Sequence, residues 1–425
     1  MKKILIGTAL AIVVSFYVFP VMFTFLPHSI NSKMLLAAFG LIVFLLQGIR
    51  DHALFFSRRL ITAALMAIAF SLWCLFTITI NRTDQTVYVE YWSTFATWVG
   101  GAYGMYIILR AVHKKPDLPL LTKYLAIVCV AQCFLALMID NIPFVKAVVQ
   151  AIFWEAYDYF EGIGRLYGIG CALDSAGVRF GCIQLLIAHQ IASNQNITVN
   201  KRKMTLYIAA FILITIIGSM IARTTSVGSA IALAYILYRH VHIQRGGFVS
   251  TRQIRMFATL ALVLTAIVGL AIYLYNTNDA VHGYLRFAFE GFFNWVETGE
   301  FRTTSTDILD DMWVWPTTFR DWMIGTGRIG VFEWGSDIGY CNFVLYCGLI
   351  GLTLYASYYI FCALSLNKKF KDFYLLSLLL LAFQAAVWAK VMTDIFFILA
   401  LLMVIDGDEM EEEVPAEEVP AIEAT

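Results

Sequence analysis

The stretch TLYIAAFILITIIGSMIA, residues Thr205–Ala222, contains 18 residues and no charged side chain. A helix that crosses the hydrocarbon core of a bilayer needs about 20 mainly apolar residues. Three basic residues precede the stretch at 201–203, and Arg223 follows it directly. This pattern predicts a transmembrane helix with a basic cluster at one membrane surface and Arg223 at the other.

Hydrophobic residues make up 60% of the 425-residue chain and charged residues 14%. A soluble domain contains about half apolar and about a quarter charged residues. The net charge is zero, so no excess of basic residues suggests a nucleic-acid-binding protein. We predict an all-α, polytopic helical membrane bundle of about 12 spans, at about Ile4–Phe25, Lys33–Ile49, Leu60–Ile80, Trp92–Leu109, Leu120–Ile139, Ala176–Ala192, Thr205–Ala222, Ser226–Tyr238, Met256–Tyr275, Ile338–Ala363, Phe373–Trp388 and Val391–Ile405.

The distribution of basic residues predicts the orientation. If the N-terminus is cytoplasmic, it and the five cytoplasmic connections contain 18 of the 30 lysines and arginines. Because cytoplasmic loops carry an excess of these residues, both termini are predicted to be cytoplasmic. Residues 1–405 form a single predicted membrane domain, and the acidic tail 406–425 is predicted to be disordered.

Two long segments, at about 140–175 and 276–337, are predicted on the outer face. The second contains GTGRIG, residues 325–330, which matches the G-x-G-x-x-G pattern of dinucleotide-binding turns. That pattern requires a strand directly before it, and no strand is predicted here. We therefore expect Gly325 and Gly327 to let the backbone turn and approach a ligand closely, and we exclude a nucleotide site.

Arginines in or beside these outer segments predict a site for a lipid diphosphate. Arginine presents a rigid fork that binds phosphate through two hydrogen bonds and does not lose its charge. The alternative is that each arginine pairs with a nearby acidic side chain or a lipid phosphate. The seven residues are Arg165, Arg179, Arg223, Arg286, Arg302, Arg320 and Arg328.

The connection that carries Arg223 is very short, so its side chain lies at the membrane edge or inside the bundle. A charge in that position requires a partner and indicates a functional site. The alternative is an arginine at a helix end whose guanidinium extends to the membrane surface.

Apolar residues between Thr304 and Trp322 recur at helical spacing and predict an interfacial lid, kinked or split at Pro316. Its tryptophans are expected at the level of the lipid headgroups. The alternative is a lid packed on the bundle. The apolar residues are Ile308, Met312, Trp315, Phe319 and Trp322.

Acidic residues near the last spans have two interpretations. Asp337 directly precedes an apolar span, so its carboxylate is expected to cap a helix, to act as a general base, or both. Lys390 and Asp394 are four residues apart in an apolar block, which favours an internal ion pair between them that holds helices together, with a contact to substrate as the alternative.

The sequence contains no pattern that indicates a metal or a cofactor. The eight cysteines form no C-x-x-C pair. We also find no HExxH, Walker or G-x-S-x-G motif. The cysteines are expected to be buried apolar residues.

Four segments resemble the O-antigen polymerase and O-antigen ligase superfamily of bacterial envelope glycosyltransferases. They are ARTTSVGSAIAL (222–233), Arg302 with MWVWPTTFRDWMIGTG (312–327), SDIGYCNFVLYCGLIGLTLY (336–355) and GRLYGIGCALDSAG (164–177). Ligases of this type carry histidine at the position of Asp337. The resemblance therefore favours a polymerase.

The resemblance implies an enzyme of the bacterial inner membrane that makes O-antigen, capsule or a similar polysaccharide. Its donor is an undecaprenyl-diphosphate-linked glycan, and its acceptor is a sugar hydroxyl on a second lipid-linked repeat unit. A chain-length regulator and a flippase are implied partners. The alternatives are an O-antigen ligase and, from another class, a flippase for lipid-linked sugars, which requires polar groups along a path through both leaflets.

The chemistry of such a reaction requires no metal, because arginines can stabilise the charge of a departing diphosphate. We expect Arg223 and Arg302 to hold the diphosphate and Asp337 to accept the proton of the attacking hydroxyl. The other residues expected to contact substrate are Arg328, Arg165, Arg179, Arg320, Gly325, Gly327 and Tyr340.

Overall fold

The computed structural model describes residues 2–52, 57–163, 165–193, 200–242, 272–366 and 373–411, together with isolated residues between 258 and 270. Helices dominate, and one small antiparallel sheet pairs β1 (Met22–Phe23) with β2 (Phe153–Trp154). The helices are α1 (Lys2–Val18), α2 (Ser32–Arg50), α3 (Arg58–Asn81), α4 (Tyr91–His113), α5 (Leu118–Asn141), α6 (Pro143–Ile152), α7 (Tyr157–Gly162), α8 (Leu173–Ser193), α10 (Lys201–Ile221), α11 (Thr224–His242), α13 (Asp279–Ala288), α14 (Glu290–Thr298), α15 (Thr304–Asp311), α16 (Phe319–Ile324), α17 (Gly330–Trp334), α18 (Gly339–Leu364), α19 (Phe373–Trp388) and α20 (Phe396–Glu411).

Five helices of the described part of the chain are long and apolar enough to cross a membrane: α2, α3, α5, α10 and α18. The predicted all-α membrane protein is thus confirmed at this level. The count of 12 spans stays a prediction, and the span predicted at Met256–Tyr275 lies mostly outside the described residues. Helix α20 continues to Glu411, so the first residues of the predicted tail are helical, and 412–425 lie outside the described residues.

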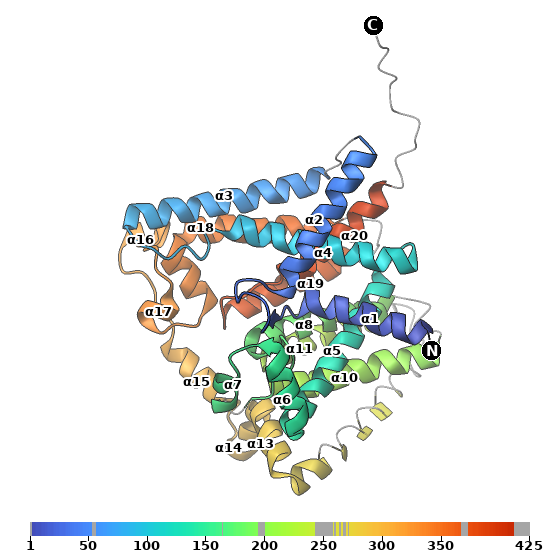
Figure 1. Cartoon of the computed structure of the whole chain (residues 1–425). Coiled ribbons are helices and arrows are strands. Elements are labelled where there is room, and N and C mark those ends of the chain that lie inside the picture. Colours follow the sequence, from blue (N-terminus) through green and yellow to red (C-terminus); the bar gives the residue numbers. More distant parts are fainter. Residues whose placement is uncertain are drawn as a thin grey trace.

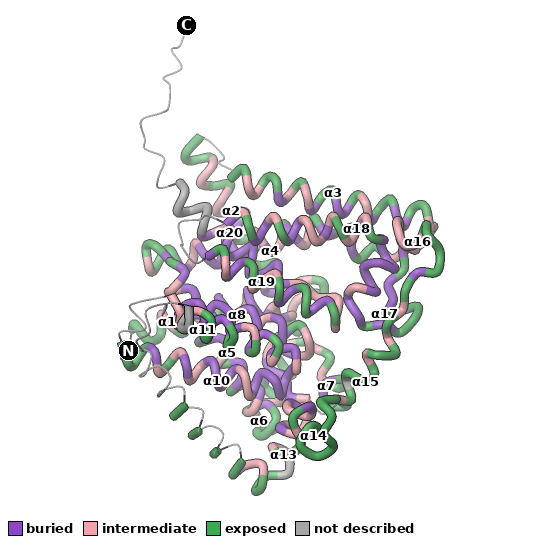
Figure 2. Tube along the Cα trace, turned by 180° about the vertical axis from the view of Figure 1, so that it is seen from behind, coloured by how far each residue is buried: buried purple, intermediate pink, exposed green. Residues whose placement is uncertain are grey.

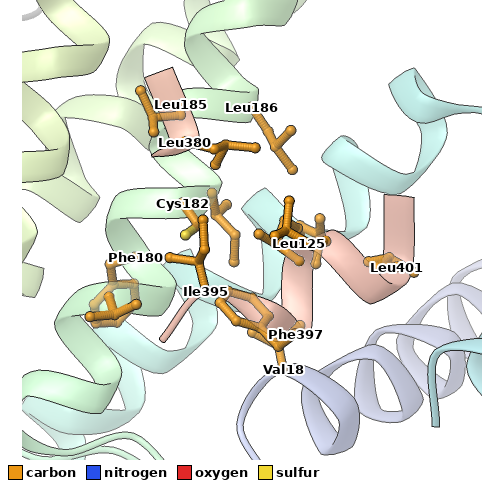
Figure 3. Close-up of a cluster of buried hydrophobic side chains, with 14 of the residues drawn as sticks. Val18, Leu125, Phe180, Cys182, Leu185, Leu186, Leu380, Ile395, Phe397 and Leu401 are labelled. Atoms are coloured by element: carbon orange, nitrogen blue, oxygen red, sulfur yellow. The ribbon is translucent and has the colours of Figure 1, made fainter. Parts of the chain in front are cut away.

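The surface and the core have the apolar pattern of a membrane bundle. Leu41, Leu65 and Leu72 are each more than half exposed on α2 and α3, as expected where lipid replaces water around a helix. Helix α8 lies at the centre and is buried along most of its length (Figure 2). Its apolar side chains pack against residues of α1, α5, α19 and α20 (Figure 3).

The long connections gather at one end of the bundle, which we call the loop end. Figure 1 shows α15, α16 and α17 there, with α16 beside the adjoining ends of α3 and α18. At the same end, Tyr284 of α13 donates a hydrogen bond to Asp140 of α5 over 2.6 Å. The sheet of β1 and β2 joins the connection after α1 to the connection after α6.

Helix α18 is interrupted at Gly348, although its sequence predicts one continuous span. Gly348 has φ +69°, and a Cβ there would lie 2.3 Å from the carbonyl oxygen of Met323. The break leaves carbonyl groups without their helical partners. The N–H groups of Thr326 and Gly327 donate to the carbonyls of Leu345 and Tyr346 over 2.6 and 3.0 Å. The loop after α16 therefore stabilises the broken helix.

Trp73 of α3 satisfies a third carbonyl at the break, because its indole N–H donates to Cys347 over 2.8 Å. We expect Trp73→Phe to lower the free energy of unfolding by about 1–2 kcal/mol, since it leaves a buried acceptor unpaired. Circular dichroism during denaturation in detergent micelles measures this change. Trp92→Phe is the matched control, because the side chain of Trp92 is exposed. Equal stability of the two variants would contradict the role of Trp73.

The lid predicted between Thr304 and Trp322 is split into two short helices. Helix α15 ends at Asp311 and α16 begins at Phe319. Pro316 lies between them and provides no backbone N–H for a helix. The rings of Trp315 and Trp322 stack with their centroids 5.4 Å apart. The tryptophans thus pack on each other across the split, rather than along one helix face.

Candidate functional site

Arg223 lies in the connection between α10 and α11 and is held by two groups from the segment of α13 and α14. Its Nε donates to the carbonyl of Phe287 over 2.9 Å, and its Nη2 lies 2.5 Å from Oε2 of Glu290. Only 15% of the Arg223 side chain is exposed. The predicted partner of this charge therefore exists, as expected for an arginine at the edge of an apolar bundle.

Phe287 brings a second arginine to the same place. The guanidinium carbon of Arg223 lies 4.0 Å from the Phe287 ring centroid, and that of Arg165 lies 4.8 Å from it. Arginines over an aromatic ring are stabilised by its quadrupole. We call Arg165, Arg223, Phe287 and Glu290 the Phe287 site. It joins the two long loop segments predicted to be functional.

The electrostatics of the Phe287 site keep its groups charged. Burial lowers the pKa of Arg223, Glu290 opposes this shift, and Arg165 adds to it. Burial would raise the pKa of Glu290, but hydrogen bonds from Thr304 and the contact with Arg223 outweigh it and lower this pKa. Since arginine retains its proton at physiological pH, two cations and one anion face each other here.

A second charged group adjoins this site and is built on Asp174 of α8. The Lys390 ammonium lies 2.5 Å from Oδ1 of Asp174 and 3.1 Å from the Thr224 hydroxyl. Thr224, the residue after Arg223, also donates to Asp174. Arg165 lies within electrostatic reach of the same carboxylate. We call Asp174, Thr224 and Lys390 the Asp174 group.

The ion pair predicted between Lys390 and Asp394 is wrong. Residues 389–395 lie outside any helix, so the expected spacing of four residues along one helix face does not apply. The Asp394 carboxylate instead accepts hydrogen bonds from Tyr355 and from the N–H of Phe396, over 3.3 and 2.9 Å. Lys33 of α2 and Arg179 of α8 are the cations within electrostatic reach of this carboxylate among the described residues.

Arg179 and Glu155 form a third charged group at the loop end. Nη1 of Arg179 donates to the carbonyl of Gly170 over 3.3 Å, and the N–H of Gly170 donates to Glu155 over 2.6 Å. Burial raises the pKa of Glu155 to about 7, although the Gly170 N–H and Arg179 both favour its ionised form. This carboxylate can therefore gain or lose a proton near neutral pH.

Glu155 should make the protein less stable as the pH rises. A carboxyl whose pKa is higher in the folded than in the unfolded state contributes stability below the unfolded pKa, and this contribution disappears as the pH passes the folded pKa. The window for Glu155 runs from its ordinary value of 4.5 to about 7. We expect the melting temperature to fall by a few degrees between about pH 5 and pH 8.

Thermal melts of Glu155→Gln across this pH range measure the effect, because the variant should lose most of the pH dependence. Glu161→Gln is the matched control. The hydrogen bond from Lys146 lowers the pKa of Glu161, so its contribution changes only at lower pH. An unchanged pH dependence in Glu155→Gln would contradict the assignment.

Three of the predicted substrate-binding arginines lie on the surface and pair locally. The guanidinium of Arg302 lies 2.9 Å from Asp307, that of Arg328 lies 3.0 Å from Glu333, and that of Arg320 donates to Asn81 over 3.0 Å. Each of these arginine side chains is at least half exposed.

The structure shows no contact between these three guanidiniums and the Phe287 site among the described residues. Arg302 is the nearest of the three to this site along the chain. It lies two residues before Thr304, whose backbone N–H donates to Glu290 of the site over 3.0 Å. The predicted convergence of arginines is thus observed for Arg165 and Arg223 alone within the described chain, whereas the guanidinium of Arg179 on α8 lies over the ring of Phe19.

The loop of Gly325 and Gly327 has a structural role. Its N–H groups donate to carbonyls of α16 and α18, and the N–H of Ile329 donates to Gln85 over 2.5 Å. These donors are therefore not directed toward a ligand. Tyr340 is also engaged, because its hydroxyl donates to the carbonyl of Ala385 over 2.9 Å.

Asp337 is exposed and is not the helix cap that was expected. The N-cap residue of α18 is Ile338, and no side chain caps this helix. In the described part of the chain, the Asp337 carboxylate has no hydrogen-bond or ion-pair partner. Gly339, two residues later, lies against Trp388 and Val391. Asp337 is thus near the segment that carries Lys390 and is free to contact another molecule.

The sequence did not indicate the acidic members of these groups. Asp174, Glu155 and Glu290 are ordinary acidic residues of loops and helix starts, and their partners lie 14 to 216 residues away along the chain. Only the position of Asp174 inside the segment GRLYGIGCALDSAG pointed to its region. Within the described ranges, no three His, Cys, Asp or Glu side chains gather as metal ligands would.

No family model, curated protein or solved structure matches this chain.

Proposed function

We propose that the protein is an oligosaccharide repeat-unit polymerase, which transfers a glycan from undecaprenyl diphosphate to a lipid-linked acceptor sugar on the outer face of the bacterial inner membrane. The observation that supports this most is the pair of guanidiniums of Arg165 and Arg223 on Phe287, at the loop end of a membrane bundle. Two neighbouring arginines match the charge of a diphosphate that lies at a membrane surface.

The proposed donor binds with its diphosphate at the Phe287 site. Glu290 neutralises Arg223 in the free protein and yields this contact to the incoming phosphate. The glycosidic bond to the diphosphate then breaks, and its electron pair remains on the departing phosphate oxygen. Arg165 and Arg223 stabilise that charge in a partly buried environment, where prearranged donors act strongly. Lys390 adds a third cation beside them.

Asp337 is the proposed proton acceptor. Its carboxylate is exposed and unpaired among the described residues, so it can approach the hydroxyl of an acceptor sugar. The hydroxyl oxygen forms the new bond to the anomeric carbon while its proton passes to Asp337. Arg302, Arg328 and Arg320 lie on the surface at the loop end and can contact the second lipid-linked substrate. This chemistry needs neither a metal nor a cofactor.

Deletion of the gene in its host, followed by gel analysis of surface and lipid-linked glycans, tests the proposal. Single repeat units on the final carrier, with no long chains, are the expected result. Long undecaprenyl-linked chains would instead indicate an O-antigen ligase. Single units that accumulate on the cytoplasmic side would indicate a flippase, and unchanged glycans would reject all three functions. A plasmid with Asp337→Asn should fail to restore long chains if Asp337 is the base.

A further inference from the structure

A cavity of about 820 Å³ lies between α2 and α3, with α4 behind it. None of the residues of the Phe287 site or the Asp174 group lines it. Helix α2 packs closely along α4, because a Cβ on Gly104 would lie 2.2 Å from the Leu36 carbonyl. Helix α3 packs on α4 and α18. The two helices thus leave a groove on the outside of the bundle, which we call the α2–α3 groove.

The groove is long and mainly apolar. Along α4 it is lined from Ser93 to Arg110, which at 1.5 Å per residue is roughly 25 Å. The hydrocarbon core of a bilayer is about 30 Å thick. Leu41 and Leu65 line the groove and are more than half exposed. The groove therefore opens toward lipid and has the length of an acyl chain that lies parallel to the helices.

Basic residues lie at one end of the groove. Arg59 at the start of α3 and Arg110 near the end of α4 both line it. Asp51 lines it too, but Arg50 donates to both oxygens of that carboxylate, over 2.7 and 3.1 Å. Two guanidinium-bearing side chains, Arg59 and Arg110, therefore line this end of the groove.

This end is opposite to the loop end. Arg59 and Asn81 are 22 residues apart on α3, or roughly 33 Å at the helical rise, and Asn81 accepts the hydrogen bond from Arg320 at the loop end. A lipid with its phosphate at Arg59 would thus belong to the other leaflet from a diphosphate at the Phe287 site.

We propose that the α2–α3 groove binds one anionic glycerophospholipid. An acyl chain occupies the apolar part, and the headgroup phosphate lies at Arg59 and Arg110. Each basic residue near the membrane surface strengthens binding of an anionic lipid, and burial of the acyl chain provides the remaining affinity. The lipid keeps α2 and α3 apart and completes the packing around α4. This inference does not depend on the proposed enzyme function.

Native mass spectrometry of the delipidated protein in detergent tests the proposal, with phosphatidylglycerol and phosphatidylcholine as probes. We expect one phosphatidylglycerol to bind in preference to phosphatidylcholine. Arg59→Ala with Arg110→Ala should weaken this binding by about tenfold or more. Arg58→Ala is the matched control, because Arg58 is exposed and does not line the groove. Equal binding by the double variant and the control would overturn the proposal.

A second variant tests the acyl part separately and covers the case in which the double variant does not fold. Ala96 is exposed and lines the groove, so Ala96→Trp should fill it and reduce phosphatidylglycerol binding. Ala9→Trp, on the exposed side of α1, is its control. Equal affinity for both lipids, or the same degree of thermal stabilisation by inorganic phosphate alone, would contradict a bound phospholipid.

Discussion

Lys390→Met should lower the free energy of unfolding by about 3 kcal/mol, because it leaves the Asp174 carboxylate charged and without its main partner. Removal of one member of a buried ion pair costs about 3–5 kcal/mol. The lower end applies here, since the Lys390 and Asp174 side chains keep 28% and 24% of their surface exposed. Denaturation of the purified protein in mixed micelles measures the change.

A double variant distinguishes the ion pair from simple loss of packing. Lys390→Met with Asp174→Asn removes both charges and introduces an amide whose oxygen can still accept the hydrogen bond from Thr224. It should recover most of the lost stability, because no unpaired charge remains. Lys203→Met, at an exposed position of α10, is the control and should be neutral. If the double variant were as unstable as Lys390→Met, the pair would not be the cause.

Arg223→Ala should lower the rate of polymer formation by roughly 10² to 10³, if the Phe287 site stabilises the departing diphosphate. Loss of one prearranged donor that acts on developing charge has an effect of this size. Arg223→Lys keeps the charge but loses the fork that contacts Phe287 and Glu290, so it should be impaired as well. Polymer length in a deletion strain that produces each variant at the normal level is the measurement.

Two controls separate catalysis from stability in this prediction. Arg286→Ala removes an arginine of α13 that pairs with Glu297 on the surface, so it should leave polymer formation intact. Glu290→Gln removes the partner of Arg223 without removing the cation. Its activity should stay within a few fold of wild type, whereas a collapse equal to that of Arg223→Ala would show that the ion pair supports the fold. Normal polymer in Arg223→Ala would refute its role.

The long apolar helices could be predicted from the sequence because each depends only on a run of consecutive apolar residues. The run at Thr205–Ala222 corresponds closely to α10, which is long enough to cross a membrane, and the run at Phe373–Trp388 corresponds to the shorter apolar helix α19. An apolar run of sufficient length has to satisfy its backbone hydrogen bonds internally, and the helix does so wherever the run lies in the fold. The position of Arg223 directly after the end of α10 follows in the same way from the two apolar runs beside it.

The break of α18 could not be predicted, because the groups that stabilise it lie outside the apolar stretch that forms this helix. Gly348 is one small residue in an apolar stretch of 26 residues, and its sequence context is compatible with a straight helix. The carbonyls that the break exposes are satisfied by Thr326, Gly327 and Trp73, which come from two other parts of the chain. The same contacts give the glycine loop its structural role.

The sequence by itself determined that the chain is a bundle of membrane helices with a charged residue at the edge of α10, since hydrophobic length and charge are properties of consecutive residues. Only the tertiary structure decided which charges meet. Lys390 pairs with Asp174, 216 residues away, rather than with Asp394, four residues away. Electrostatic energy depends on distance in space and on burial, and in this fold both are set by the packing of α8 against its neighbours.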